Sequence, residues 1–408
     1  MSSSKTVRCL ACSAAVATFV LFAPSLLMEQ SPFYMLVTSA NVTGLNETNT
    51  SAHQVMPVPA SSPNPTIVLA WTKRYGGEWT SIDYLFQNCP SCIISRDRQL
   101  VRNSTAILFH ARSIEWDDIP PNRRSSQYYV FILHESPHYT FQDIQSDGRS
   151  NFFNLTMTYR YDSDIVWPYG SFQMKSSENR DSNLYVNEMM KLTIEGKSKL
   201  VSWFVSDCET FSRREVLVRE IQQHIAVDVY GSCGTLQCPR EVPTIGWKPG
   251  MADAPACHHM LTKDYKFYLS FENSLCRDYV TEKFFLVMDN ALVVPIVMER
   301  KIIMDTVRDF ETAAMLNRSF IAVDDFPTVQ DMVAYLEYLD QNTTAYLQYF
   351  QWRKNYQIVF DRATVDAGCE LCRIIREKTE KTIENIFEWW DTDAQCHSYE
   401  PVTSNDKS

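Results

Sequence analysis

The sequence is poor in glycine, and the nucleotide-binding and catalytic motifs that depend on glycine do not occur in it. Only 11 of its 408 residues are glycine. It contains no Gly-x-Gly-x-x-Gly turn and no Gly-Lys-Ser/Thr phosphate loop. It also lacks the Gly-x-Ser-x-Gly nucleophile elbow. These absences argue against a dinucleotide-dependent dehydrogenase, a P-loop enzyme and an α/β-hydrolase.

The chain also lacks an excess of positive charge. Its 38 Lys and Arg residues stand against 49 Asp and Glu residues, which gives a formal net charge of −11. Such a protein is not expected to bind nucleic acid nonspecifically. A few local cations are still enough to hold an anionic ligand, and the length leaves room for one to three domains.

The N-terminus carries one long apolar run. Lys5 and Arg8 precede it, and it extends from Cys9 to Met28, long enough to cross a bilayer as a helix. The basic flank predicts a cytoplasmic tail over 1–8 and an uncleaved signal anchor over 9–28, with the rest of the chain in a lumen. The alternative is a cleaved signal peptide, but no small-x-small cleavage site follows closely.

The chain beyond this run has features of a secretory-pathway protein. Ten of the 12 cysteines lie there. So do seven Asn-x-Ser/Thr sequons, at Asn41, Asn46, Asn49, Asn103, Asn154, Asn317 and Asn342. Together these features predict a lumenal, glycosylated protein whose cysteines form disulfide bonds.

The organisation of the chain follows from composition and periodicity. Residues 29–65 are rich in Ser, Thr, Asn and Pro and predict an extended stem. Short apolar β runs then alternate with helical patterns, which predicts an α/β fold of mostly parallel sheets with helices on both faces. The chain contains two blocks with this pattern, 66–195 and 196–375. Residues 376–408 hold most of a terminal helix, predicted over 373–393, and a polar tail.

Two Cys-x-x-Cys pairs, Cys89/Cys92 and Cys369/Cys372, could bind zinc or act as redox dithiols. Both functions need reduced thiols, and the predicted compartment is oxidising. Structural disulfides are the preferred interpretation. Their connectivity does not follow from the sequence.

The segment 266–283 forms a strand–loop–helix pattern. An apolar run from Phe267 to Phe271 ends at the polar loop Glu272-Asn-Ser274, and a helix is predicted to begin near Asp278, a good N-cap residue. Glu282 and Lys283 then fall in its first turn. Ligands of open α/β sheets bind at the carboxyl ends of strands, so this is either a binding site or a helix cap with a surface salt bridge.

Two further acidic positions could carry chemistry. Glu135 follows the apolar run Tyr128–Leu133, where a strand would hold a general base rigidly, although a solvated loop carboxylate is equally compatible. Asp162-Ser-Asp164 resembles a metal-binding Asp-x-Asp of nucleotide-sugar enzymes. A turn with an Asx hydrogen bond is the preferred interpretation.

Several ordered blocks resemble the α1,3-fucosyltransferase family. The segment Ser270–Lys283 is similar to the family's signature, and Glu135-Ser-Pro137 is similar to its Glu-Ser-Pro motif. Further blocks follow in the family's order: 153–159, 162–165, 168–170, 199–203, 227–231, 323–326 and the closing Cys369-x-x-Cys372. The similarity covers residues 66 to about 375.

This resemblance implies a GT-B-like architecture, in which two Rossmann-like domains face a cleft behind an N-terminal anchor and stem. The acceptor-side domain would be 66–195 and the GDP-fucose-binding domain 196–375. It implies a single-pass type II Golgi membrane protein that transfers L-fucose from GDP-L-fucose to O3 of a GlcNAc on N-glycan acceptor glycoproteins. The anomeric centre is inverted. No cofactor is required, no metal site is expected, and a divalent cation is at most stimulatory.

The resemblance also implies roles for individual residues. Glu135 matches the catalytic base, and Lys283 and Arg214 match cations that contact the phosphates, although Arg213 is adjacent and a one-residue shift would select it. Asn273, Tyr279 and Glu282 match donor-binding positions.

The chain departs from many relatives in two segments. They are Met298–Asp305, after Pro295-Ile-Val297, and the acceptor-side stretch from Phe109 onward. These departures leave donor contacts in the first segment undecided. The acceptor is either the innermost core GlcNAc, which is favoured, or an antennal Lewis-type GlcNAc. Other functional classes are a catalytically inactive glycan-binding Golgi membrane protein on the same fold, and a zinc or redox protein.

Overall fold

The computed structural model describes residues 65–74, 77, 79, 82–140, 150–176, 183–237, 255–378 and 380–401. The predicted cytoplasmic tail and membrane anchor, and nearly all of the stem, lie outside the described residues. Among the described residues, no helix combines the length and apolarity needed to cross a membrane. The two sheets described below belong to one compact unit, Val58–Ser408.

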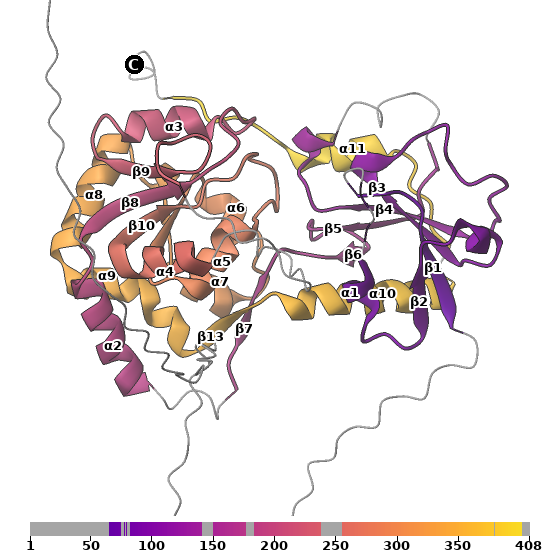
Figure 1. Ribbon diagram of the computed structural model, residues 1–408, viewed down its shortest axis with the longest axis horizontal. Helices are drawn as coiled ribbons and strands as arrows, with labels where there is room; N and C mark the ends of the chain where they lie inside the picture. The colour runs from indigo at the N-terminus through magenta and orange to yellow at the C-terminus, as the bar shows by residue number, and fades with distance from the viewer. Residues whose placement is uncertain are drawn as a thin grey trace, which may run out of the picture. The chain divides into compact units, whose positions relative to one another are not determined.

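The first sheet contains six parallel strands (Figure 1). In sheet order they are β2 (Cys92–Ser95), β1 (Thr66–Ala70), β3 (Ala106–His110), β4 (Tyr128–Leu133), β5 (Leu155–Thr158) and β6 (Ile165–Val166). Val130 and Ile132 pack toward α1 (Asp83–Phe86) and α10 (Asp361–Glu377). Tyr129 and Phe131 pack toward α11 (Ile386–Trp390). Because both faces are covered, the strands are almost uninterrupted apolar runs.

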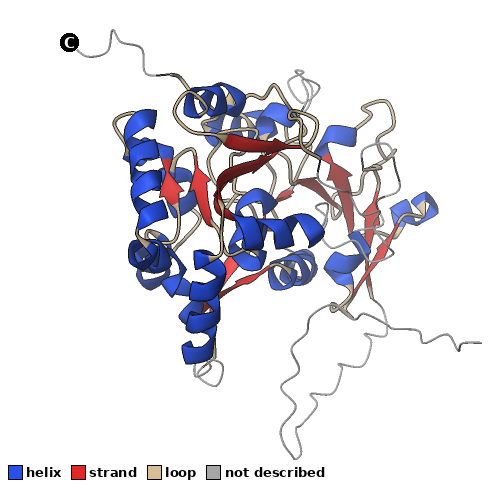
Figure 2. Ribbon diagram, turned by 60° about the vertical axis from the view of Figure 1, so that its left-hand side comes forward, coloured by secondary structure: helices blue, strands red, loops and turns tan. Residues whose placement is uncertain are grey.

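The second sheet contains five parallel strands. In sheet order they are β12 (Ile321–Ala322), β11 (Val294–Val297), β10 (Tyr265–Leu269), β8 (Lys199–Phe204) and β9 (Val227–Tyr230). Phe267 and Leu269 pack in one apolar cluster with α3 (Arg214–Ile221) and α8 (Val329–Gln341). Tyr268 packs on the other side with α4 (Pro255–Asp264) and α5 (Glu282–Asn290). Helices lie on both sides of the strands in Figure 2, which confirms the predicted parallel α/β architecture.

Smaller elements complete the described chain. An antiparallel ribbon joins β7 (Ser171–Met174) to β13 (Tyr356–Val359). The remaining α-helices are α2 (Asn183–Glu195), α6 (Arg300–Met304), α7 (Phe310–Leu316) and α9 (Thr343–Leu347). Short 3₁₀ turns cover Arg98–Arg102, Ala111–Ser113, Pro137–Tyr139, Val323–Asp325, Gln348–Lys354 and Thr392–Ala394.

The prediction of one terminal helix over 373–393 is wrong. Helix α10 already begins at Asp361 and ends at Glu377, where Lys378 adopts a left-handed conformation with φ of 56°. Helix α11 starts afresh after Asn385, whose side chain accepts a hydrogen bond from the backbone N–H of Glu388. The apolar periodicity runs through this break because both helices bury residues on the first sheet.

Disulfide bonds join segments that are distant in sequence. Each Cys-x-x-Cys pair is bonded to the other, through Cys89–Cys369 and Cys92–Cys372. Cys208–Cys233 and Cys276–Cys396 are further bridges. The expectation of structural disulfides is therefore confirmed. The two Cys-x-x-Cys pairs have no free thiols for zinc or redox chemistry.

Candidate functional site

The loops that follow β4 and β10 meet at the carboxyl ends of the two sheets. Glu135-Ser-Pro137 follows β4, and Glu272-Asn-Ser274 follows β10. The hydroxyls of Ser136 and Ser274, both buried, form a hydrogen bond of 2.7 Å. Beside it, the Tyr279 hydroxyl donates to Glu135 Oε2 over 3.3 Å. The structure thus brings Glu135 against the loop that carries the predicted donor residues.

A buried carboxylate organises the second loop. Glu272 accepts hydrogen bonds from the Thr281 backbone N–H at 2.8 Å and from the Thr281 hydroxyl at 2.9 Å. Thr281 is the N-cap of α5, so the prediction that the helix begins near Asp278 is wrong. Asp278 instead has a positive φ and accepts a hydrogen bond from the Tyr161 backbone. Because Thr281 is fixed, Glu282 and Lys283 occupy the first helical turn as predicted.

Two carboxylates keep the Lys283 ammonium charged. Its Nζ lies 3.1 Å from Glu282 Oε1 and 3.4 Å from Glu272 Oε2. Burial acts to lower the pKa of Lys283, but Glu282 and Glu272 raise it well above its ordinary value. Burial also raises the pKa of Glu272, a shift that Lys283 opposes. A fixed positive charge therefore stands at the carboxyl end of β10.

A second cation, Arg214, approaches from the first turn of α3. Its side chain is buried and donates to the carbonyl oxygens of Phe271, at 2.7 Å, and Asp207, at 3.2 Å. Its charge acts to lower the pKa of Lys283, so the two cations are close enough to interact. Arg213 instead forms an ion pair with Glu400 at 3.0 Å. Of the two arginines, Arg214 is the one that contacts the segment after β10, through the Phe271 carbonyl oxygen.

Two buried polar atoms of the predicted donor-binding residues have no hydrogen-bond partner among the described residues. They are Arg214 Nε and Asn273 Oδ1. A buried polar atom without a partner is costly in free energy. Both atoms belong to residues that the sequence predicts to bind the donor, and a polar ligand would lower this cost.

The two acidic residues of Asp162-Ser-Asp164 are held by protein cations. Asp162 pairs with Arg160 at 2.6 Å and also with Arg277. Asp164 pairs with Lys381 and accepts from the backbone N–H of Thr156 at 2.9 Å. This arrangement agrees with the preferred interpretation of the motif as a structural turn.

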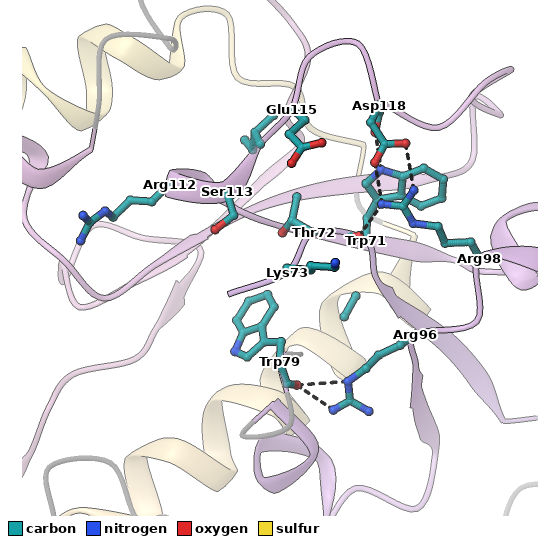
Figure 3. A pocket seen from close by; sticks show the side chains of 12 residues that line it. Trp71, Thr72, Lys73, Trp79, Arg96, Arg98, Arg112, Ser113, Glu115 and Asp118 are labelled. Carbon is teal, nitrogen blue, oxygen red and sulfur yellow. Dashed lines mark hydrogen bonds and ion pairs between the residues drawn. The ribbon is translucent and has the colours of Figure 1, made fainter. Parts of the chain in front are cut away.

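A cavity of about 620 Å³ lies at the carboxyl edge of the first sheet, the edge at which Glu135 follows β4. Figure 3 shows the side chains that line the cavity. Its walls come from the segments after β1 and β3, including Thr72, Lys73, Ser113 and Glu115. Trp71 and Trp79 also line it and are mostly buried. The sequence analysis did not predict these residues, although polar residues follow both apolar runs, at Thr72-Lys73 and at Arg112-Ser113.

One wall of the cavity is stiffened by polar contacts around Trp71. The Arg98 guanidinium lies 4.1 Å from the centre of the Trp71 ring and pairs with Asp118 at 2.7 Å (Figure 3). The Trp71 indole N–H donates to the Asp118 carbonyl oxygen at 2.6 Å. The cavity therefore combines a fixed aromatic wall with charged and hydroxyl groups, as sites for polar ligands do.

The buried His110 ends β3, and the half-buried His134 directly follows β4. Burial lowers the pKa of His110 to about 3, with Arg74 and Arg112 adding to the effect. Burial also lowers the pKa of His134 to about 3. The His134 ring packs against Trp167, with ring centres 3.6 Å apart, and its Nε2 lies 2.6 Å from the Trp167 carbonyl oxygen.

Residues 63–170 match the family described as "Fucosyltransferase, N-terminal", and residues 194–389 match "Glycosyltransferase family 10 (fucosyltransferase) C-term". A relative in Caenorhabditis elegans, "Alpha-(1,3)-fucosyltransferase fut-1", is 33% identical over 80% of this chain and 68% of its own length. "Alpha-(1,3)-fucosyltransferase C" of Drosophila melanogaster is 32% identical over 81% and 79%. The mouse "4-galactosyl-N-acetylglucosaminide 3-alpha-L-fucosyltransferase 9" is 32% identical over 80% and 82%.

A crystal structure of an α1,3-fucosyltransferase with GDP-fucose is also similar. Its sequence is 15% identical, and the TM-score is 0.47 over 83% of this chain and 95% of that one.

We predict that stability falls as the pH is lowered from about 6.5 toward about 3, because unfolded His134 takes up a proton near its ordinary pKa while folded His134 does not. The loss is up to about 1.4 kcal/mol per pH unit for each such histidine. His134→Gln retains a donor for the Trp167 carbonyl but cannot titrate. Urea unfolding across this range should show a shallower pH slope for the variant, and identical slopes would contradict the prediction.

Proposed function

Since the chain belongs to glycosyltransferase family 10, the fucosyltransferases, we propose that it transfers L-fucose from GDP-fucose to O3 of a GlcNAc on N-glycans, with inversion at the fucose C1. The innermost core GlcNAc is the favoured acceptor, and an antennal Lewis-type GlcNAc is the alternative. The observation that carries this proposal is the contact between the Glu135 loop and the loop of Asn273, Tyr279 and Lys283.

The proposed reaction is a single displacement with Glu135 as the base. Its carboxylate takes the proton from the acceptor O3 while O3 forms a bond to the fucose C1. The bond from C1 to the β-phosphate oxygen breaks, and GDP leaves with the electron pair. A half-buried carboxylate at a strand end, held by the serine hydrogen bond beside it, is suited to this proton transfer.

Charge grows on the β-phosphate as GDP leaves, and fixed cations stabilise it. We assign this role to Lys283 and Arg214. Lys283 is kept protonated by its two carboxylate neighbours, and Arg214 is fixed by the Phe271 carbonyl. With two protein cations in place, the chemistry requires no bound metal, and a divalent cation would be at most stimulatory.

The remaining donor contacts follow from the same loop. Asn273, with its unpartnered Oδ1, and the Tyr279 hydroxyl are assigned to the donor. Glu282 is assigned to a hydroxyl of the fucose, since it lies one residue before Lys283 on the same helical turn. All these groups come from the second sheet and its helices.

On the acceptor side, the cavity beside Trp71 and Lys73 is positioned for sugars that neighbour the reacting GlcNAc. Strand β1 is separated from β4 by β3 alone, so the cavity begins about 10 Å from the Glu135 strand. The two sheets would then serve as the two Rossmann-like domains of a GT-B-like enzyme, one for the acceptor and one for GDP-fucose.

We further propose that the protein acts in the Golgi lumen as a single-pass type II membrane protein. The apolar run 9–28 and the sequons support this location, and the disulfide bonds are compatible with an oxidising lumen. The domain boundaries at 65, 195 and 375 are part of this proposal. Helix α10 crosses the last of them and packs on the first sheet.

The lumenal part should transfer fucose from GDP-fucose to defined N-glycans. Acceptors that offer only the core GlcNAc, or only an antennal lactosamine, would separate the two acceptor classes, with the linkage read by mass spectrometry and NMR. Failure on every GlcNAc-containing acceptor would overturn the proposed function. Glycan binding without transfer would instead identify an inactive glycan-binding protein.

Glu135→Gln should reduce kcat by about 10²- to 10⁴-fold, because it removes the base and retains the shape of the side chain. GDP affinity, measured by calorimetry, should stay within about twofold, since Glu135 does not belong to the phosphate site. Exposed Glu311→Gln is the matched control. Turnover of Glu135→Gln near that of the control would show that the base is another residue.

Lys283→Ala should weaken GDP binding and lower kcat/KM for GDP-fucose by about 10²-fold or more, because a phosphate contact is lost in both the ground state and the transition state. Lys283→Arg retains the charge and should recover part of the loss. Lys301→Ala, at a side chain that is 79% exposed, serves as the control. Unchanged GDP affinity in folded Lys283→Ala would refute the phosphate contact.

A further inference from the structure

The C-terminal segment 394–400, which we call the strap, lies along the loop that follows β10. The Arg277 backbone N–H donates to the Ala394 carbonyl oxygen at 2.8 Å, and the His397 N–H donates to the Leu275 carbonyl oxygen at 2.9 Å. Between these two contacts, the Cys276–Cys396 disulfide joins the strap to the loop covalently. In Figure 1 the yellow C-terminal segment runs from α11 toward α3.

The strap also holds the loop that precedes α3. The Tyr399 backbone N–H donates to the Ser212 carbonyl oxygen at 3.0 Å, and the Ser398 hydroxyl donates to the Phe211 carbonyl oxygen at 2.8 Å. Glu400 pairs with Arg213 at 3.0 Å. The Tyr399 hydroxyl reaches Glu220 on α3 at 2.7 Å. The strap therefore contacts both loops that lead to the proposed donor residues.

Ser212 is the point at which these contacts converge. Its backbone N–H donates to the Asn273 carbonyl oxygen at 3.0 Å, and its hydroxyl donates to the Glu272 carbonyl oxygen at 2.7 Å. Its own carbonyl oxygen accepts from Tyr399. Ser212 thus connects the strap to Asn273 on one side and, two residues further along the chain, to Arg214.

The disulfide of the strap also borders the base loop. A ring nitrogen of His138, three residues after Glu135, lies within 4.8 Å of both sulfurs of Cys276–Cys396. The family match ends at residue 389, before the strap begins. The donor and base loops are therefore fixed in part by residues outside the matched region.

We propose that the strap is a positioning element of the donor site, which sets Asn273, Arg214 and the adjoining Lys283 for the diphosphate before GDP-fucose binds. This inference rests on the proposed function. Pre-ordered ligands raise affinity because less conformational freedom is lost on binding. The strap touches no reacting atom in this proposal, so its loss alters donor binding more than acceptor binding.

The test compares the lumenal wild type with two strap variants. Cys276→Ala/Cys396→Ala removes the covalent tie without leaving a free thiol. The same chain ended after residue 393, with Cys276→Ala, removes the strap. Cys89→Ala/Cys369→Ala is the matched control, because it deletes one of two adjacent bridges between α10 and the β2 region, away from the donor loops. Thermal unfolding confirms that each variant is folded.

We expect KM for GDP-fucose and Kd for GDP to rise at least fivefold in the double cysteine variant and further in the truncated chain, with acceptor KM within twofold of wild type. The control should keep both values. Unchanged GDP affinity in both strap variants, or an equal rise in donor and acceptor KM, would overturn the proposal. GDP calorimetry tests the strap even if no acceptor is fucosylated, so its failure is distinguishable from failure of the proposed function.

Discussion

A half-buried ammonium between two carboxylates is the interaction on which the site depends. Removing an ion from water is unfavourable unless it is paired, and the partly exposed Lys283 is paired with Glu272 and Glu282. Glu272 also fixes Thr281, which caps α5 and sets the start of that helix. Glu272 therefore contributes both to the charge of the lysine, together with Glu282, and to the place where its helix begins. The same loop also carries Ser274, whose hydroxyl forms the hydrogen bond to Ser136 of the Glu135 loop.

The features predicted most accurately from the sequence are those that local residue patterns determine. The bounds of β4 agree with the apolar run Tyr128–Leu133, because the polar residues His134 and Glu135 follow it directly. Parallel strands place their carboxyl ends at one edge of the sheet, where ligands bind. The position of Glu135 at that edge could therefore also be predicted from the sequence. Glu282 and Lys283 were placed correctly in a first helical turn.

The remaining features depend on contacts between distant residues. Asp278 is a good cap by residue type, yet its carboxylate is used by Tyr161, 117 residues earlier in the chain. The break after Lys378 is hidden because the apolar pattern continues through it. Ser136 and Ser274 carry no signal of their pairing, and neither do Cys276 and Cys396. The roles of the site residues came from the family resemblance. The spacing of residues in 266–283 fitted a helix cap with a surface salt bridge as well as it fitted a binding site.

The long bridges from α10 to the β2 region have a consequence for biosynthesis. Cys89 and Cys92 leave the ribosome 280 residues before their partners Cys369 and Cys372. One face of the first sheet is covered by α1 and α10 and the other by α11, so neither face is completely covered until α10 and α11 have been synthesised. The second sheet has its own helices and can close earlier. The first sheet, and the two disulfide bonds that tie α10 to it, are therefore completed late in synthesis.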